Sequence, residues 1–170
     1  NYELPFQYLV ENVKPARLKN SDQASQKYWW LHQRSRGEMK SALKNLTRYI
    51  GTARVAKHRL FIWLDIRTVP DSQVVVFTRE DDYFFGVLHS LLHEIWALRL
   101  GTSLEDRPRY TPTTSFETFP FPWTPGQEPG EAEDRRVAAI AQWARALVQW
   151  RDAWLNPPPR RPVRRAGHRL

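Results

Sequence analysis

Basic side chains are concentrated between residues 34 and 59. This segment carries eight Lys or Arg residues against one acid, Glu38, which gives it a local charge of +7. Cations that cluster in this way can follow a phosphate backbone. Thr52, His58 and Trp63 lie among or next to them, and such side chains can contact phosphates or base edges. The run favours nucleic-acid binding, and its alternative is a solvated basic face that binds nothing.

The string NPPP at residues 156–159 invites comparison with the Asn/Asp-Pro-Pro-aromatic loop by which amino-methyltransferases hold a target amine. The aromatic residue is missing here, and the string follows a predicted helix and leads into an Arg-rich tail. Proline commonly stands just after the end of a helix. We therefore interpret NPPP as a helix stop and expect no catalysis from it.

His89 and His93 are four residues apart, so they share one face of the helix predicted there. A zinc-protease helix needs Glu directly after the first His. Ser90 stands at that place, and Glu94 is displaced from it. We expect structural or DNA-facing histidines and predict no metal site.

The acids Glu80, Asp81 and Asp82 would suit a metal-dependent nuclease, but no lysine-bearing strand motif follows them. Capping of the helix that begins there explains them more simply. With only seven glycines, the chain shows no phosphate loop and no strand-Gly-x-Gly loop for S-adenosylmethionine. The chain itself is expected to be non-catalytic and to hold no cofactor.

The N-terminal part is predicted to contain no long helix. Because Pro5 and Pro15 disfavour one, residues 1–25 are interpreted as an extended segment. Residues 26–46 have apolar side chains at helical spacing, interrupted around residues 34–37. That pattern predicts two short helices.

A β-rich stretch follows, in which residues 47–57, 59–66 and 73–79 are dense in β-branched and aromatic side chains. These three segments predict one antiparallel sheet. After them, Asp81 or Asp82 can cap a helix that carries a broad apolar stripe and ends at Gly101.

The last third of the chain changes character twice. Residues 101–123 are rich in Thr and Pro, which predicts short strands and turns that can present side chains. Residues 131–156 have apolar side chains every three or four positions, the pattern of a long amphipathic helix. The Pro/Arg tail at 157–170 has too few apolar residues to pack, so we expect it to be disordered.

The composition is that of a folded chain with room for one domain and an appended helix. Its 170 residues are 41% hydrophobic and include eight Trp, which is too apolar for a disordered segment. Cysteine is absent, so disulfides are excluded, and no apolar run reaches the length of a membrane span. A cytoplasmic location without membrane contact is expected. The start at Asn1 shows neither Met nor a signal-peptide pattern and is interpreted as a fragment boundary.

Four ordered blocks of sequence carry a family resemblance. The strings YWWLHQRSRGEM, RYIGTARVAKHRLFIWL, DDYFFGVLHSLLHEIWALRLG and RYTPTTSFETFPFP resemble the target-recognition region of large single-chain DNA methyltransferases, the MmeI-like restriction-modification enzymes and related adenine-specific enzymes. The resemblance covers roughly residues 5 to 156. Phe85 to Ser90 also resembles the helix that opens after the recognition strands in type I specificity subunits, and the Pro/Arg tail departs from the family.

The resemblance implies a bacterial parent enzyme that transfers a methyl group from S-adenosylmethionine to the exocyclic N6 amine of adenine. In that family the methyltransferase domain precedes the target-recognition region, which would explain why no cofactor loop is found here. The implied partners of this chain are double-stranded DNA and that N-terminal methyltransferase domain. The implied role is recognition of the DNA sequence.

The expected DNA contacts come from two sources. The basic run supplies phosphate contacts at Arg34, Arg36, Lys40 and Lys44. The resemblance places base-reading residues in the loops around two blocks, at Arg48, Thr52, Arg54, Lys57, His58, Arg107, Arg109, Thr111, Thr113 and Thr114. Arg107 and Arg109 alternate about Pro108 and are predicted to project to the same side, where at least one reads guanine. In the alternative, they form salt bridges with Glu105 and Asp106.

We predict an α+β domain with an antiparallel or mixed sheet over residues 47–120, flanked by helices. The DNA target-recognition domain spans residues 26–123, and the helix at 131–156 packs on it or links it. The predicted function is sequence-specific recognition of duplex DNA in the major groove. Two alternatives stay open: a standalone nucleic-acid enzyme such as a nuclease, and a protein-interaction scaffold whose Trp-rich C-terminal helix docks on a partner.

Overall fold

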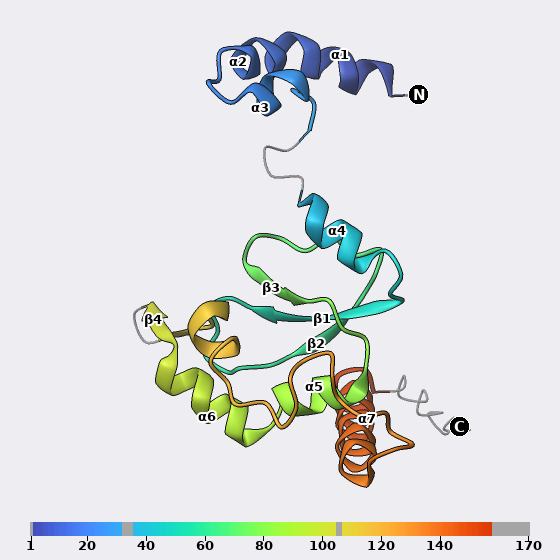
Figure 1. Cartoon of the computed structure of the whole chain (residues 1–170). Coiled ribbons are helices and arrows are strands. Elements are labelled where there is room, and N and C mark those ends of the chain that lie inside the picture. Colours follow the sequence, from blue (N-terminus) through green and yellow to red (C-terminus); the bar gives the residue numbers. More distant parts are fainter. Residues whose placement is uncertain (1, 32–35, 105–106, 158–170) are drawn as a thin grey trace, which may run out of the picture. The chain divides into compact units, whose positions relative to one another are not determined.

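A computed structural model describes residues 2–31, 36–104 and 107–157 (Figure 1). The chain divides into two compact units, Asn1–Lys44 and Asn45–Leu170. Among the described residues, no helix combines the length and the apolar character that crossing a lipid bilayer requires.

The first unit is helical throughout its regular structure. It contains α1 (Glu3–Asn12), α2 (Lys14–Leu18), α3 (Gln23–Lys27) and α4 (Gly37–Leu43). Of the two short helices predicted over residues 26–46, the second is confirmed as α4, whereas the first is misplaced: α3 ends at Lys27, and Trp29 and Trp30 lie in the turn after it.

The prediction of an extended segment over residues 1–25 is wrong. Pro5 occupies the first turn of α1, and Pro15 lies at the start of α2. At these positions the missing proline N–H has no partner inside the helix anyway, so proline does not interrupt it. Trp29 is buried in this unit and packs against the ring of Phe6 at a centroid distance of 5.9 Å.

The second unit is built on a three-stranded antiparallel sheet, as the β-rich stretch predicted. The central strand β1 (Arg48–Ala53) pairs with β2 (Ile62–Asp65) on one side and with β3 (Val74–Phe77) on the other. In this register Ile50 lies opposite Trp63 on β2 and Phe77 on β3. The sheet's apolar side chains therefore reach the core together.

The helix predicted from Asp81 to Gly101 is instead two helices, α5 (Asp82–Leu88) and α6 (Leu91–Leu100). The break lies at Ser90, whose extended backbone ends one helix and whose Oγ accepts a hydrogen bond from the His93 N–H at 3.2 Å. Serine competes in this way for backbone donors and favours the N-cap of a new helix. Capping by Asp81 is confirmed, because its carboxylate accepts from the Phe84 N–H at 2.8 Å.

The predicted single sheet over residues 47–120 is two sheets. After α6, β4 (Thr102–Leu104) and β5 (Arg107–Arg109) form a separate antiparallel pair. The five residues Pro112–Phe116 then form the π-helix η1, where only strands and turns were expected. The amphipathic C-terminal helix is confirmed as α7 (Arg135–Leu155), with Asp134 as its N-cap.

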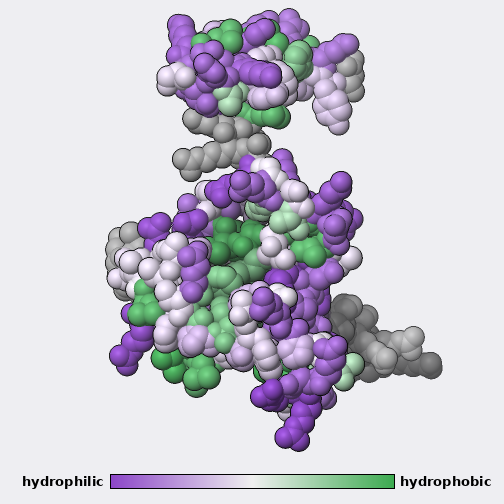
Figure 2. All heavy atoms as spheres, in the orientation of Figure 1, coloured by the Kyte–Doolittle hydropathy of each residue, from purple (hydrophilic) through white to green (hydrophobic). Residues whose placement is uncertain are grey.

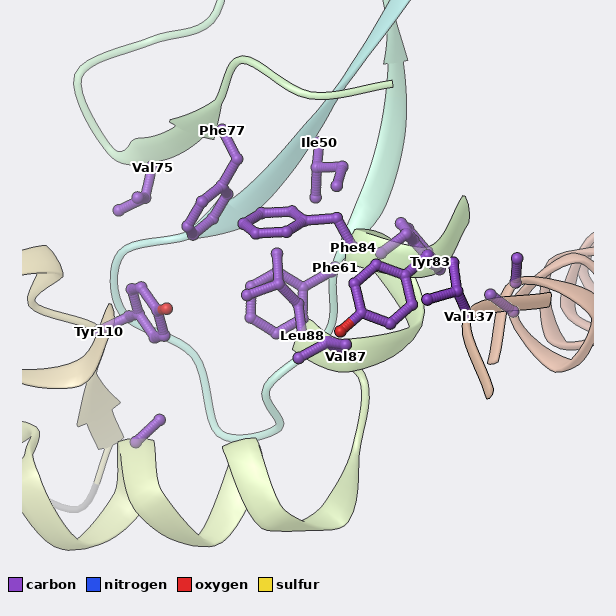
Figure 3. Packing of buried hydrophobic residues seen from close by; sticks show 14 residues of the cluster. Ile50, Phe61, Val75, Phe77, Tyr83, Phe84, Val87, Leu88, Tyr110 and Val137 are labelled. Carbon is purple, nitrogen blue, oxygen red and sulfur yellow. The ribbon is translucent and has the colours of Figure 1, made fainter. Parts of the chain in front are cut away.

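The core lies between the strands and α5, and α5 packs in turn on α7 (Figure 3). Phe61 contacts Phe77 and Tyr110 at centroid distances of 5.8 and 5.9 Å. The α5–α7 contact is close at Gly86, where an added Cβ would lie 2.7 Å from Ile140 Cγ2. Only glycine permits this approach.

Acidic residues at the start of α5 connect three elements. The Arg48 guanidinium of β1 pairs with Asp82 Oδ1 at 2.9 Å, and Arg145 of α7 reaches Asp82 Oδ2 at 3.2 Å. Glu80 accepts from the backbone N–H of Thr47 at 2.8 Å. The acidic run thus holds β1, α5 and α7 together.

His93 is fully buried and holds one tautomer. Its Nδ1–H donates to the Leu88 carbonyl at 2.9 Å, and its Nε2 accepts from the Tyr110 hydroxyl at 3.2 Å. Burial lowers the pKa of His93 to about 4. Nearby, His89 Nε2 lies 2.8 Å from the Phe61 carbonyl. Both imidazole rings therefore form hydrogen bonds that stabilise the core.

The stability of the fold should fall when the pH drops from about 6.5 to about 4. The unfolded chain takes up a proton at the ordinary histidine pKa of about 6.5, whereas folded His93 does so only near 4. The contribution of neutral His93 is thus complete above pH 6.5 and is lost toward pH 4, by roughly 3 kcal/mol. Denaturant unfolding across this range measures it.

The variant His93→Gln keeps a donor for Leu88 and an acceptor for Tyr110 but does not titrate. It should show a smaller fall in unfolding free energy over the same pH range. His58→Gln, on an exposed histidine, is the matched control. Equal pH dependence of the wild-type chain and His93→Gln would contradict this role of His93.

Candidate nucleic-acid interface

Two segments far apart in the sequence lie side by side at the end of β1. Val55 forms an isolated bridge with Arg109, and the Tyr110 N–H donates to the Arg54 carbonyl at 2.7 Å. The Ala56 N–H donates to the Pro108 carbonyl at 3.3 Å. Both loops in which the sequence placed base-reading residues therefore meet at one site.

The side chains at this site are basic and largely exposed. Lys57 and His58 are exposed on the first segment, and Arg107 and Arg109 are exposed on β5. Because side chains two residues apart on a strand share a face, the two arginines project to the same side of β5, as predicted.

Within the described part of the chain, neither Arg107 nor Arg109 forms an ion pair. The alternative pairing with Glu105 and Asp106 lies outside the described residues. Arg54 is half-buried, and its buried Nε has no hydrogen-bond partner there.

Hydroxyl side chains continue this surface beyond β5. Thr111 is half-buried, and Thr113 and Thr114 are exposed on η1. They lie two to five residues after Arg109 in the chain.

The prediction that Thr52 contacts DNA is wrong. Its side chain is only 2% exposed, its Oγ1–H donates to the Leu60 carbonyl at 2.7 Å, and Oγ1 accepts from Arg59 at 3.1 Å. The alternation of β1 turns it into the core, where DNA cannot reach it.

Arg48 is engaged within the fold. Besides its ion pair with Asp82, its Nε and Nη2 donate to the Glu80 carbonyl at 3.2 and 2.9 Å. The guanidinium also lies 3.8 Å from the centre of the Trp63 ring. These contacts give Arg48 a structural role within the fold.

The basic run at residues 34–59 is divided between the two units. Arg36, Lys40 and Lys44 are exposed and belong to the first unit, on or beside α4. Arg34 lies outside the described residues. The continuous charge in the sequence is therefore not one surface of a single compact unit.

Sequence reasoning missed the different nature of Arg59. This arginine is 9% exposed, and burial lowers its pKa. Its Nη2 donates at 3.2 Å to the Pro108 carbonyl, 49 residues along the chain. No local signal separates Arg59 from exposed Lys57, because its burial depends on that distant strand.

Apolar side chains are also exposed on the second unit. Figure 2 shows them gathered over α6, where Leu91, Leu92 and Ile95 are 68%, 74% and 47% exposed. On α7, Trp143 and Trp150 are 67% and 68% exposed. This α7 face is distinct from the face that Val137 and Ala141 bury against α5.

Comparisons with known proteins agree with the resemblance seen in the sequence. The family model "MmeI, target recognition domain" matches residues 5–123. A search of curated proteins found no match. The solved structure of the Type IIL restriction-modification enzyme MmeI in complex with DNA shares the fold, with a TM-score of 0.63 and 21% sequence identity over 89% of this chain.

The chain spans only 19% of the length of that MmeI chain. The α+β fold predicted from the sequence is confirmed, with small antiparallel sheets, flanking helices and a C-terminal helix. Since the family model covers well over half of its residues, the chain belongs to the MmeI target recognition domain family.

Proposed function

We propose that this chain recognises the sequence of duplex DNA through the paired segments at residues 54–58 and 107–109. The observation that carries the proposal is their juxtaposition, which gathers exposed cations from both segments on one rigid backbone pairing. The family match and the DNA-bound relative support it. Sites built on strands hold side chains with better defined geometry than sites on free loops.

The geometry of β5 suits base reading. Side chains two residues apart on a strand are separated by about 6.6 Å, close to two base-pair steps of about 3.4 Å. Arginine donates in a fixed fork that fits guanine O6 and N7 in the major groove. Arg107 and Arg109 are therefore the proposed readers, and Lys57 is the proposed phosphate contact.

We also propose that this recognition serves a longer bacterial enzyme that methylates adenine N6 with S-adenosylmethionine. The support is the restriction-modification relative, of which this chain spans one fifth. Chemistry on adenine requires the base to leave the stack, so recognition and methyl transfer are assigned to separate parts. The chain described here contributes the DNA contact, and the cofactor is assigned to the methyltransferase part.

The exposed tryptophans of α7 support an interaction between these parts. Trp143, Trp150 and Trp154 are 67%, 68% and 79% exposed on one helix. Exposed aromatic side chains grouped in this way mark protein interaction surfaces. The occupant we propose is the methyltransferase part of the same longer polypeptide, a narrower form of the scaffold alternative.

Lys57→Ala should weaken the salt dependence of DNA binding. Each phosphate contact contributes close to one unit to the slope of log affinity against log salt, so losing one should flatten the line by about that amount. Lys40→Ala and Lys44→Ala test the first unit in the same way. Lys19→Ala, also exposed, is the control, and unchanged slopes in all variants would exclude these phosphate contacts.

Arg107→Ala and Arg109→Ala should lose discrimination at particular base pairs. A bidentate arginine–guanine contact contributes about 1 to 3 kcal/mol of discrimination at one base pair. Binding to singly substituted duplexes, taken from a site selected out of a random library, measures the loss. Arg99→Ala, an exposed arginine on α6, is the matched control. If both variants keep the wild-type preference at every position, these arginines do not read bases.

Trp150→Gln should weaken binding of the chain to the separately produced methyltransferase part. Truncating a central aromatic contact commonly costs about 2 kcal/mol or more, roughly a thirtyfold loss of affinity, measured by titration calorimetry. Trp30→Gln, 50% exposed in the first unit, is the control. Equal affinities for the wild-type chain and Trp150→Gln would argue against this docking face.

A further inference from the structure

Arg59 is a buried cation whose hydrogen-bond partners within the described residues are all neutral. Its Nη1 donates to Thr52 Oγ1 at 3.1 Å and to the Ala53 carbonyl, and its Nη2 donates to the Pro108 carbonyl at 3.2 Å. Among the described residues it has no carboxylate partner. A charge is seldom buried without such a partner, so this arrangement needs an explanation.

The partners of Arg59 show what the guanidinium holds. Pro108 lies between Arg107 and Arg109, and its carbonyl accepts from Arg59 and from the Ala56 N–H. The Arg59 guanidinium also lies 5.2 Å from the ring centre of Tyr110, the residue after Arg109. Arg59 therefore contacts the Pro108 backbone between the two proposed readers and the Tyr110 side chain that follows Arg109.

A guanidinium is suited to this task because its donors lie in a fixed planar fork. Thr52 Oγ1 and the Ala53 carbonyl fix one end of the fork to β1, and the Pro108 carbonyl occupies the other. Lysine would supply the charge without the fork. The geometry thus couples the orientation of β5 to the central strand of the sheet.

We propose that Arg59 is a positioning residue for DNA reading: its fork fixes the peptide between Arg107 and Arg109, so that both side chains meet base edges in one geometry. The inference rests on the proposed function. A recognition contact must be held within about 0.5 Å and 10–20° of its productive geometry. If β5 were not held in this geometry, it would keep its charges and its attraction to phosphates, but it would lose discrimination between base pairs.

The test compares Arg59→Lys with the wild-type chain on the duplex selected from a random library and on its singly substituted versions. Arg59→Lys should lower the preference at the base pairs read by Arg107 or Arg109 about tenfold, the size expected for one lost bidentate contact. The salt slope should stay unchanged because the charge is kept. Adding Arg109→Ala to Arg59→Lys should lower the preference at the Arg109 position no further than Arg109→Ala alone.

Two further variants separate positioning from stability. Val137→Ala removes a buried side chain at the α5–α7 contact, so it should lower stability and leave the base preference intact. Thr52→Val removes the hydroxyl acceptor of Arg59 and leaves the guanidinium in place. It should also lower the preference at the base pairs read by Arg107 or Arg109. If Arg59→Lys does not fold, Thr52→Val alone tests whether Arg59 positions β5.

The outcomes distinguish the two levels of inference. A wild-type chain that prefers some duplexes, with that preference unchanged in Arg59→Lys and Thr52→Val, would overturn the positioning role alone. An equal loss of affinity for every duplex would also overturn it. A wild-type chain that selects no sequence from the library would overturn the proposed function and this inference together.

Discussion

The pairing of residues 54–56 with residues 108–110 is the contact on which the larger unit depends. It joins two sheets that share no other strand pairing in the described part of the chain. A two-stranded hairpin is at best marginally stable by itself, so β4 and β5 owe their placement to this contact. Through it Tyr110 also enters the core, where its ring lies 5.9 Å from Phe61 and 6.1 Å from Phe77.

A buried polar network gives this contact its specificity. Arg59, whose Nη1 donates to Thr52 Oγ1, also donates to the Pro108 carbonyl, and the Tyr110 hydroxyl donates to His93 Nε2. Apolar packing alone tolerates small shifts of one element over another, whereas buried polar groups lose much free energy when they are left unpaired. The network therefore favours one position of β5 over its neighbours.

The sequence was informative wherever a local pattern determined the structure. The density of β-branched and aromatic residues predicted the three strands, apolar side chains every three or four positions predicted α7, and Asp81 indicated the start of α5. Sequence-based prediction failed where the structure depends on a residue's position within an element or on a partner far away in the chain. Pro5 suits the first turn of α1, a role that composition alone does not reveal.

The residues of the candidate site show the same difference between what local patterns predict and what distant contacts determine. The sequence grouped Lys57 with Arg109 only through family resemblance, since nothing local pairs residues so far apart. The role of Arg59 was beyond local reasoning, because its burial depends on the distant Pro108 peptide. Side-chain type alone cannot separate an arginine that contacts DNA from one that supports the contact.

The separation of supporting residues from the proposed reading residues has an evolutionary consequence. Arg107 and Arg109 are exposed and form no ion pair within the described residues, whereas Arg59 is buried and bonded on both sides. Substitutions of exposed residues without such contacts usually change stability by less than about 0.5 kcal/mol. The two proposed reading positions can therefore change type while the network beneath them keeps β5 in place. A fold arranged in this way allows new specificities to arise without a new scaffold.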